Sequence, residues 1–210
     1  MKNKKNIPNI LTISRLISVV IFILLLIIYA IINTNPTADL TILRGIMAIQ
    51  YLLLVVFIFA MVSDYLDGYL ARKWNVVSTF GKIFDPIADK LITTTMLISL
   101  IAQITEIYFI IIVILLVLRD ILVDGFRIYA ASLNISVQAN IWGKIKTILM
   151  SVSLIIIGLF APIILSNELN NIRLYLFIIT LPLIATLIIS YISGYIYISS
   201  YLKNSKFKIK

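Results

Sequence analysis

The sequence has no cysteine and no histidine, and only 13% of its 210 residues are charged. Without cysteine there can be no disulfide and no thiol nucleophile, and without either residue type there can be no zinc site built on thiolate or imidazole ligands. An imidazole base is excluded in the same way. Any acid–base or metal chemistry in this chain therefore depends on carboxylates.

Hydrophobic residues make up 61% of the chain, well above the roughly 45–50% that is usual for soluble domains. They fall in six blocks, at about residues 13–32, 46–62, 91–104, 107–123, 145–165 and 175–197. An α-helix needs about 20 apolar residues to cross a hydrocarbon core ~30 Å thick. We predict an all-α integral membrane fold with six transmembrane helices, which forms a single domain over residues 1–210.

The net charge of +9 is distributed unevenly along the sequence. With the amino terminus in the cytoplasm, inner segments contain every one of the 18 basic residues except Arg44 and Arg173. The positive-inside rule requires this asymmetry. We therefore expect a multi-pass protein of the cell (plasma) membrane with both termini in the cytoplasm. The short basic segments at the two ends are expected to lie against anionic membrane lipids, and no nucleic-acid partner is expected.

Four of the nine acidic residues lie close together, as the pair Asp64 and Asp67 followed by the pair Asp85 and Asp89. A spacing of three or four residues places each pair on one face of its own helix. If the two helices pack, four carboxylates converge at the cytoplasmic end of the bundle. Each charge costs about 2.5–3.5 kcal/mol at the centre of a membrane helix and less toward its ends, so the cluster needs cations.

Oxygen ligands without histidine or thiolate suit Mg²⁺ or Mn²⁺, and four aspartates are enough to hold two such ions about 3.5–4 Å apart. Two-metal sites of this kind serve phosphoryl chemistry. Three small residues, Gly68, Ala71 and Gly81, would let a nucleotide approach the backbone. Arg72 offers a planar fork for phosphate oxygens. An Asp-x-x-Asp pair alone would instead fit a capped helix end that faces water.

The pattern Asp-x2-Asp-Gly-x2-Ala-Arg-x8-Gly-x3-Asp-x3-Asp, which begins at Asp64, resembles the signature of the CDP-alcohol phosphatidyltransferases. All eight fixed positions of that signature are filled, and the six-helix membrane fold of the family agrees with the six apolar blocks. Three weaker stretches resemble the members that make phosphatidylglycerophosphate. They are residues 6–15, Arg119-Asp120 with Arg127, and residues 143–147.

The resemblance implies transfer of the phosphatidyl group of CDP-diacylglycerol to an alcohol, with release of CMP. It implies that Asp64, Asp67 and Asp85 ligate two divalent cations, Mg²⁺ or Mn²⁺, and that Asp89 is both a metal ligand and the general base. The residues expected to contact the CDP moiety are Asp67, Gly68, Ala71, Arg72 and Gly81. The resemblance also implies glycerol 3-phosphate as the acceptor and a homodimer.

A second charged group lies near the cytoplasmic ends of the fourth and fifth predicted helices, and consists of Arg119, Arg127, Lys144 and Lys146. These residues are expected on the same side as the aspartates, where they would bind the phosphate of the acceptor. The alternative is that they are positive-inside anchors, or counter-ions for Asp120 and Asp124.

Two other functions stay open at this point. The same chemistry could use inositol phosphate, serine or phosphatidylglycerol as the acceptor, because the aspartate motif does not separate these acceptors. A divalent-metal transporter could instead use the four aspartates as a permeation site. Transport is disfavoured because all four carboxylates lie at one membrane face, and no acidic residue falls in the middle of another predicted span.

Overall fold

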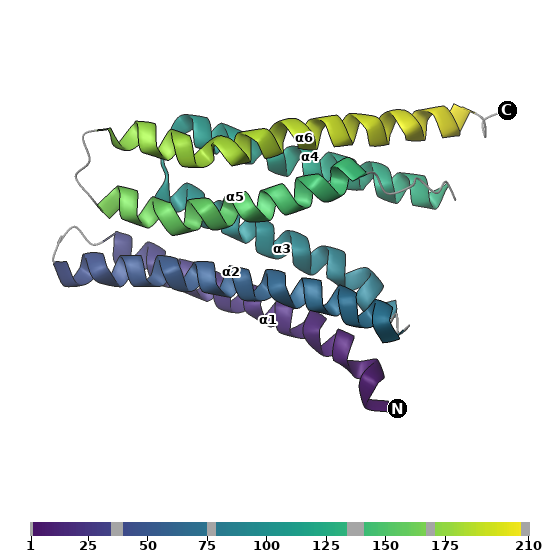
Figure 1. Cartoon of the computed structure of the whole chain (residues 1–210), viewed down its shortest axis with the longest axis horizontal. Helices are drawn as coiled ribbons and strands as arrows, with labels where there is room; N and C mark the ends of the chain where they lie inside the picture. Colours follow the sequence, from purple (N-terminus) through teal and green to yellow (C-terminus); the bar gives the residue numbers. More distant parts are fainter. Residues whose placement is uncertain (1, 35–39, 75–78, 134–140, 167–170, 207–210) are drawn as a thin grey trace. The chain divides into compact units, whose positions relative to one another are not determined.

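The computed structural model describes residues 2–34, 40–74, 79–133, 141–166 and 171–206, without the side chains of residues 2–9, 40, 71, 72, 79, 80, 82, 83 and 202–206. The described residues form six α-helices and no strand (Figure 1). The helices are α1 (Lys2–Asn33), α2 (Leu40–Trp74), α3 (Thr79–Gln103), α4 (Ile107–Ser132), α5 (Ile141–Ser166) and α6 (Ile172–Lys206). The predicted all-α fold is confirmed for this part of the chain.

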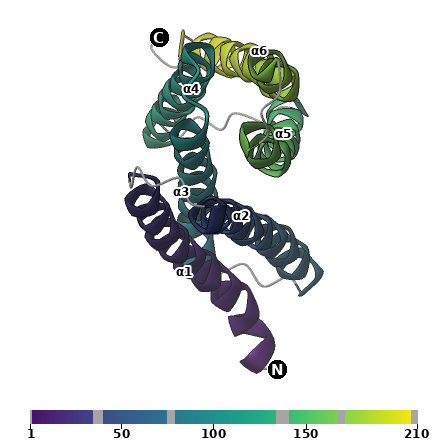
Figure 2. The same cartoon turned by 90° about the vertical axis from the view of Figure 1, so that its left-hand side faces the viewer.

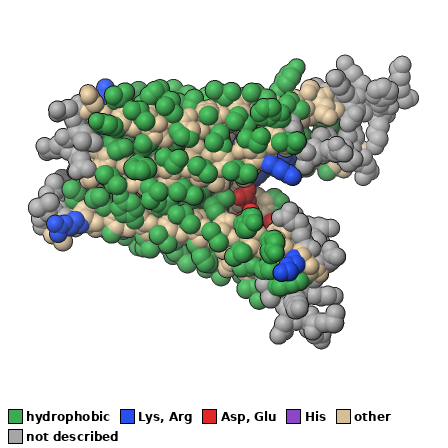
Figure 3. All heavy atoms as spheres, viewed as in Figure 1, with side chains coloured by type: hydrophobic (Ala, Val, Ile, Leu, Met, Phe, Trp, Pro, Cys, Tyr) green, Lys and Arg blue, Asp and Glu red, His purple; other side chains and the backbone are tan. Residues whose placement is uncertain are grey.

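Four of the described helices are long and apolar enough to cross a membrane, by their length and composition. The segments are Ile10–Asn33 of α1, Thr41–Leu70 of α2, Ile141–Ser166, which is the whole of α5, and Ile172–Tyr201 of α6. Large hydrophobic side chains along them stay exposed, and they dominate the face shown in Figure 3. Such exposure carries no penalty in lipid, whose tails are as apolar as leucine. The chain is therefore a multi-pass membrane protein.

The remaining two helices, α3 and α4, are 25 and 26 residues long. Both carry charged side chains, including Asp85 and Asp89 before the apolar stretch of α3 and Arg119 and Asp120 within α4. The six predicted helices are thus all present among the described residues, and four of them meet the criteria for a membrane span. Membrane crossing by α3 and α4 stays a prediction.

Most of the helices extend well beyond the apolar blocks that predicted them, and two of these extensions matter for the candidate site. The second block ends at residue 62, but α2 continues to Trp74. The third block begins at residue 91, but α3 already begins at Thr79. A helix can continue through polar residues, so hydropathy does not mark where it stops. Hydropathy alone therefore places the end of α2 too early and the start of α3 too late. The extensions carry the aspartate motif.

The chain divides into two compact units. The first unit comprises Met1–Gln103 and Gly158–Asn170, and so contains α1, α2, α3 and the end of α5. The second comprises Ile104–Ile157 and Asn171–Lys210, and so contains α4, the first part of α5 and α6. Each charged cluster that the sequence predicts lies within one of these units.

In the first unit, α1 packs against both α2 and α3 (Figure 2). All three helices carry apolar side chains that are completely or almost completely buried, among them Phe22, Leu53, Phe57, Ile92 and Met96. Burial of one such side chain stabilises a fold by about 1.5–3 kcal/mol in water, and in lipid the close packing contributes through dispersion. These contacts fix the ends of α1, α2 and α3 that carry polar residues.

In the second unit, α4 packs against α6. Both helices bury apolar side chains, among them Phe109 and Leu116 on α4 and Leu176 and Leu183 on α6. The Tyr191 hydroxyl of α6 donates a hydrogen bond to the Leu115 carbonyl oxygen of α4, at 3.3 Å. The hydroxyl oxygens of Ser153 on α5 and Thr186 on α6 lie 3.4 Å apart. Hydroxyl pairs of this kind hold membrane helices together at about 0.6–2 kcal/mol each.

Close packing within the first unit depends on Gly158, and we expect Gly158→Val to destabilise the protein. A Cβ atom at this position would lie 2.9 Å from both Leu54 Cδ1 and Met96 Cε, so a branched side chain fits only if these two buried side chains shift against their own neighbours. Overpacking of this kind costs about 1–3 kcal/mol, which would appear as a lower unfolding temperature in detergent. The matched control is Gly45→Val, because nothing lies within 4 Å of a Cβ atom there. An equal loss in both variants would contradict the packing argument.

Candidate active site

The four predicted aspartates lie on two helices of the first unit. Asp64 and Asp67 are one turn apart on α2, and Asp85 and Asp89 are one turn apart on α3. Asp67 is buried, whereas the other three are half-buried. The predicted placement of each pair on its own helix is confirmed.

A buried arginine from α1 lies among three of these carboxylates. Arg15 Nη1 is 2.8 Å from Asp64 Oδ1 and 3.8 Å from Asp85 Oδ1. Arg15 Nη2 is 3.6 Å from Asp67 Oδ2. The arginine side chain is completely inaccessible to solvent. A guanidinium without counter-charges would be very costly at such a place, so these three carboxylates account for its burial.

Thr12 lies one turn before Arg15 on α1 and joins the two aspartate helices. Its hydroxyl is 2.7 Å from Asp85 Oδ1 on α3 and 3.3 Å from Asp67 Oδ2 on α2. The threonine is fully buried. One hydroxyl therefore lies within hydrogen-bonding distance of carboxylates from both helices, which fixes the mutual register of α1, α2 and α3.

The second unit contains a separate charged cluster around Asp120 of α4. Arg119 Nη1 donates a hydrogen bond to Asp120 Oδ1 at 2.9 Å, and Lys146 Nζ of α5 donates one to Asp120 Oδ2 at 2.6 Å. Arg119 Nε donates a third hydrogen bond to the Ser190 carbonyl oxygen of α6, at 2.7 Å. Asp120 thus holds two cations from different helices side by side.

Gly194 gives Arg119 the space that it occupies. A Cβ atom at position 194 would lie 3.1 Å from Arg119 Nε and 3.2 Å from Val123 Cγ2. These separations are tighter than nine in ten natural Cβ contacts, so a side chain there would require Arg119 and Val123 to shift by a few tenths of an ångström. The glycine therefore allows the hydrogen bond from Arg119 to α6.

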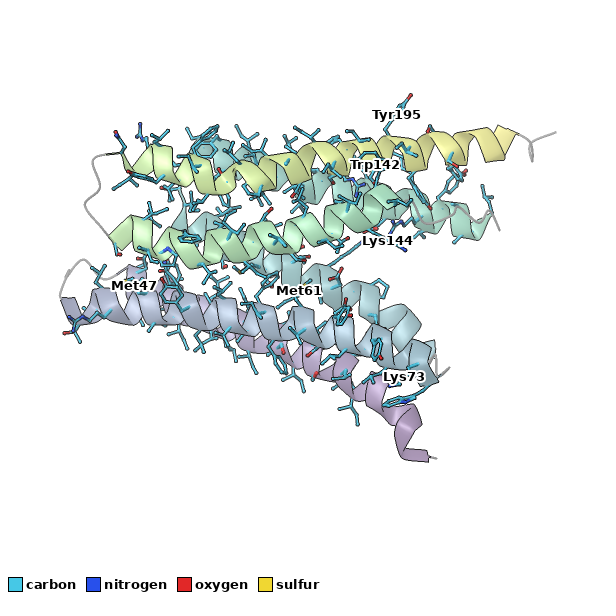
Figure 4. The ribbon with its side chains drawn as sticks, in the orientation of Figure 1. Met47, Met61, Lys73, Trp142, Lys144 and Tyr195 are labelled. Atoms are coloured by element: carbon cyan, nitrogen blue, oxygen red, sulfur yellow. The ribbon has the colours of Figure 1, made fainter. Side chains whose placement is uncertain are left out.

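The other two predicted basic residues are placed differently. Arg127 is exposed, and its guanidinium carbon lies 5.4 Å from the centre of the Tyr197 ring. Lys144 is also exposed and lies near the start of α5 together with Trp142 (Figure 4). Lys144 and Lys146 are two positions apart and so point to nearly opposite sides of the helix. Of the four residues, the structure therefore brings together Arg119 and Lys146.

The sequence profile of one family, the CDP-alcohol phosphatidyltransferases, matches residues 5–192. This match spans both charged clusters and covers most of the chain. The chain belongs to the CDP-alcohol phosphatidyltransferase family.

Similar proteins within this family share one name. The chain is 37% identical to the CDP-diacylglycerol–glycerol-3-phosphate 3-phosphatidyltransferase of Mycoplasma pneumoniae, over 99% of the chain and 92% of that relative. It is 36% identical to the protein of the same name from Rickettsia prowazekii, over 75% of the chain and 78% of that relative. It is 34% identical to the one from Bacillus subtilis, over 68% of the chain and 70% of that relative.

Divalent metal ions are typical of the CDP-alcohol phosphatidyltransferase family. Within the part of the chain that the structure describes, no three acidic side chains are arranged to hold a metal ion. Three carboxylates instead face the Arg15 guanidinium. The donor set nevertheless fits Mg²⁺ or Mn²⁺, because hard carboxylate oxygens from two helices already converge on one cation.

The predicted CDP-binding residues of this phosphatidyltransferase are described in part. Gly68 is half-buried and directly follows Asp67 on α2, and Gly81 is buried one turn before Asp85 on α3. The side chains of Ala71 and Arg72 lie outside the described residues. No described feature tests nucleotide binding, so these assignments stay predictions.

Arg15 and Thr12 belong to the family-like stretch at residues 6–15, and their position between the aspartates is apparent only in the structure. A signal for Arg15 was present, because an arginine within an apolar helix needs a partner of opposite charge. Asp120 was considered only as a possible target of the basic residues, and Ser190 was not considered. No sequence signal identifies a backbone carbonyl as the partner of a distant arginine.

Proposed function

We propose that the chain transfers the phosphatidyl group of CDP-diacylglycerol to glycerol 3-phosphate, giving phosphatidylglycerophosphate and CMP. One observation carries the proposal: Asp64, Asp67 and Asp85 of the family signature converge on a single buried cation. The named relatives support the choice of acceptor. The enzyme would therefore be a CDP-diacylglycerol–glycerol-3-phosphate 3-phosphatidyltransferase.

Asp64, Asp67, Asp85 and Asp89 are the residues that would hold two divalent ions, Mg²⁺ or Mn²⁺. Such ions, when bound, supply positive charge that offsets the diphosphate and polarises the phosphorus under attack. Among the described side chains, three carboxylates face one guanidinium, and this concentration of acidic groups supports binding of further cations.

Asp89 would also act as the general base. Its carboxylate would accept the proton of the acceptor hydroxyl as the hydroxyl oxygen attacks phosphorus and CMP leaves. Asp89 lies one turn from Asp85 on the same helix face, and its half-exposed side chain is accessible to a ligand. Five positions of the family signature would contact the CDP moiety. They are Asp67, Gly68, Ala71, Arg72 and Gly81.

The phosphate of the acceptor would bind to Arg119 and Lys146, with the exposed Arg127 and Lys144 adding positive charge near the same helix ends. Asp120 holds Arg119 and Lys146 close together, so both side chains can donate hydrogen bonds to the same phosphate. The same ion pairs also fit the alternative interpretation, in which these cations only balance Asp120 and anchor the helix ends. The dependence of KM on each residue separates the two interpretations.

The remaining assignments follow from charge and from the family resemblance. We propose that both termini and the aspartates face the cytoplasm, because nearly all basic residues then lie inside. We further propose that the protein resides in the plasma membrane as a homodimer and that its two compact units act as one catalytic domain. Placing a protease site or a fluorescent tag at either terminus would test the orientation.

The decisive experiment measures CMP release from CDP-diacylglycerol by the purified protein with Mg²⁺ or Mn²⁺. Glycerol 3-phosphate, serine, inositol phosphate and phosphatidylglycerol are offered in turn, and we expect turnover with glycerol 3-phosphate alone. Turnover with another acceptor would keep the family chemistry and overturn the substrate. Absence of CMP release together with Mn²⁺ uptake into proteoliposomes that depends on Asp85 would support transport instead.

A further inference from the structure

Arg15 combines complete burial with weak hydrogen bonding. Its side chain is inaccessible to solvent, yet none of its three guanidinium nitrogens has a well-aligned hydrogen-bond partner among the described residues. An arginine that serves as a permanent brace normally forms two parallel hydrogen bonds to one carboxylate. Arg15 instead faces three carboxylates at 2.8, 3.6 and 3.8 Å, so charge rather than directed bonding holds it there.

The oxygens that face Arg15 belong to three of the proposed metal ligands. They are Asp64 Oδ1, Asp67 Oδ2 and Asp85 Oδ1. A magnesium ion binds carboxylate oxygens at about 2.0–2.1 Å and so occupies the space between them. A guanidinium in that space would be displaced by contact and repelled by the divalent charge.

We propose that Arg15 is a built-in counter-ion of the metal site. Its guanidinium occupies the place of the divalent ions in the metal-free protein, and it leaves the carboxylates when metal binds. This inference rests on the proposed metal site and adds a competitor to it. Arg15 keeps the three carboxylates from repelling one another, so α1, α2 and α3 can pack without metal. It also lowers the affinity for metal, because its ion pairs must break first.

Thr12 allows the guanidinium to be replaced by metal without movement of the helices. Its hydroxyl lies 2.7 Å from Asp85 Oδ1 and 3.3 Å from Asp67 Oδ2, so one hydroxyl donor on α1 stays beside these carboxylates when the guanidinium leaves. Only a side chain has to move, and such movements are fast compared with rearrangement of helices. Arg15 is therefore a positioning residue and needs no contact with substrate for this role.

The test is a Mn²⁺ titration of the purified protein, followed by the electron paramagnetic resonance signal of free Mn²⁺. Arg15→Gln removes the charge, and we expect it to lower the Kd for Mn²⁺ by at least about tenfold. Arg15→Lys keeps the charge but lacks the fork that reaches three carboxylates, so its Kd should fall between those of Arg15→Gln and the wild type. The matched control is Arg44→Gln, an exposed arginine at the far end of α2, which should change Kd by less than about twofold.

Folding is followed in parallel, because Arg15→Gln leaves three buried or half-buried carboxylates without their counter-ion. We expect saturating Mn²⁺ to raise the unfolding temperature of Arg15→Gln more than that of the wild type. If Arg15→Gln does not fold, Arg15→Lys decides, and an unchanged or higher Kd in a folded variant overturns the inference.

Asp85→Asn separates failure of this inference from failure of the metal site. If Asp85→Asn binds Mn²⁺ as the wild type does, the proposed metal site itself is wrong. If Asp85→Asn loses binding while Arg15→Gln gains no affinity, the metal site stands and Arg15 is a structural brace only.

Discussion

Asp89→Asn is expected to reduce CMP release by at least about 10³-fold. Asparagine has nearly the same shape as aspartate, but it cannot accept the proton of the attacking hydroxyl, and a general base contributes roughly 10²–10⁴-fold by itself. The variant also removes one of the proposed metal ligands, which adds to the loss. The measurement is kcat for CMP release with saturating CDP-diacylglycerol and glycerol 3-phosphate.

The control for this experiment is Glu106→Gln, which removes a carboxylate at the start of α4. Glu106 pairs with the exposed Arg173 at 3.3 Å and has no part in the proposed chemistry. An exposed ion pair contributes about 0–1 kcal/mol, so activity should stay close to that of the wild type. Full activity of a well-folded Asp89→Asn would remove Asp89 from the mechanism and require another base.

Arg119→Gln should raise the KM for glycerol 3-phosphate by about 10–100-fold and leave the KM for CDP-diacylglycerol nearly unchanged. A hydrogen bond to a charged group contributes about 1.5–3 kcal/mol, and Arg119 is held against Asp120 and Ser190 in a fixed orientation. Lys146→Gln should behave in the same way. Arg127→Gln should have a smaller effect, because the Arg127 side chain is exposed and stacks over a ring.

Two further measurements test whether Arg119 acts on binding of the acceptor and not on folding. Arg173→Gln removes an exposed arginine of the same unit at the other end of the helices, and it should change neither KM. If Arg119→Gln instead lowers the unfolding temperature and leaves both KM values unchanged, the arginine and Asp120 are a structural pair. That result would favour the alternative in which the basic residues balance acidic neighbours.

The spacing of the aspartates was sufficient to predict the local structure of the motif. Residues three and four apart share a helix face, so Asp64 with Asp67 and Asp85 with Asp89 could be paired without coordinates. The lengths of α2 and α3 could not be predicted from hydropathy, because the polar extensions that carry these residues are helical without being apolar. Family membership, by contrast, was predicted correctly from eight positions of the motif.

The partners of the aspartates could not be predicted in the same way. Thr12 is separated from Asp67 by 55 positions and from Asp85 by 73, and such contacts depend on how α1 packs against α2 and α3. The cation between the carboxylates was expected to be a metal ion, and in the structure Arg15 lies there. Periodicity identifies the face of a helix, but it does not identify which other helix that face meets.

The order of the charged residues along the chain has a consequence for biogenesis. Arg15 lies on the first helix and therefore emerges from the ribosome before any of the four aspartates. When α2 follows, Asp64 and Asp67 meet a positive charge that is already in the membrane, and α3 then brings Asp85 to the same place. Insertion of each acidic helix is thus eased by the one before it, since a paired charge is less costly to bury than a lone one.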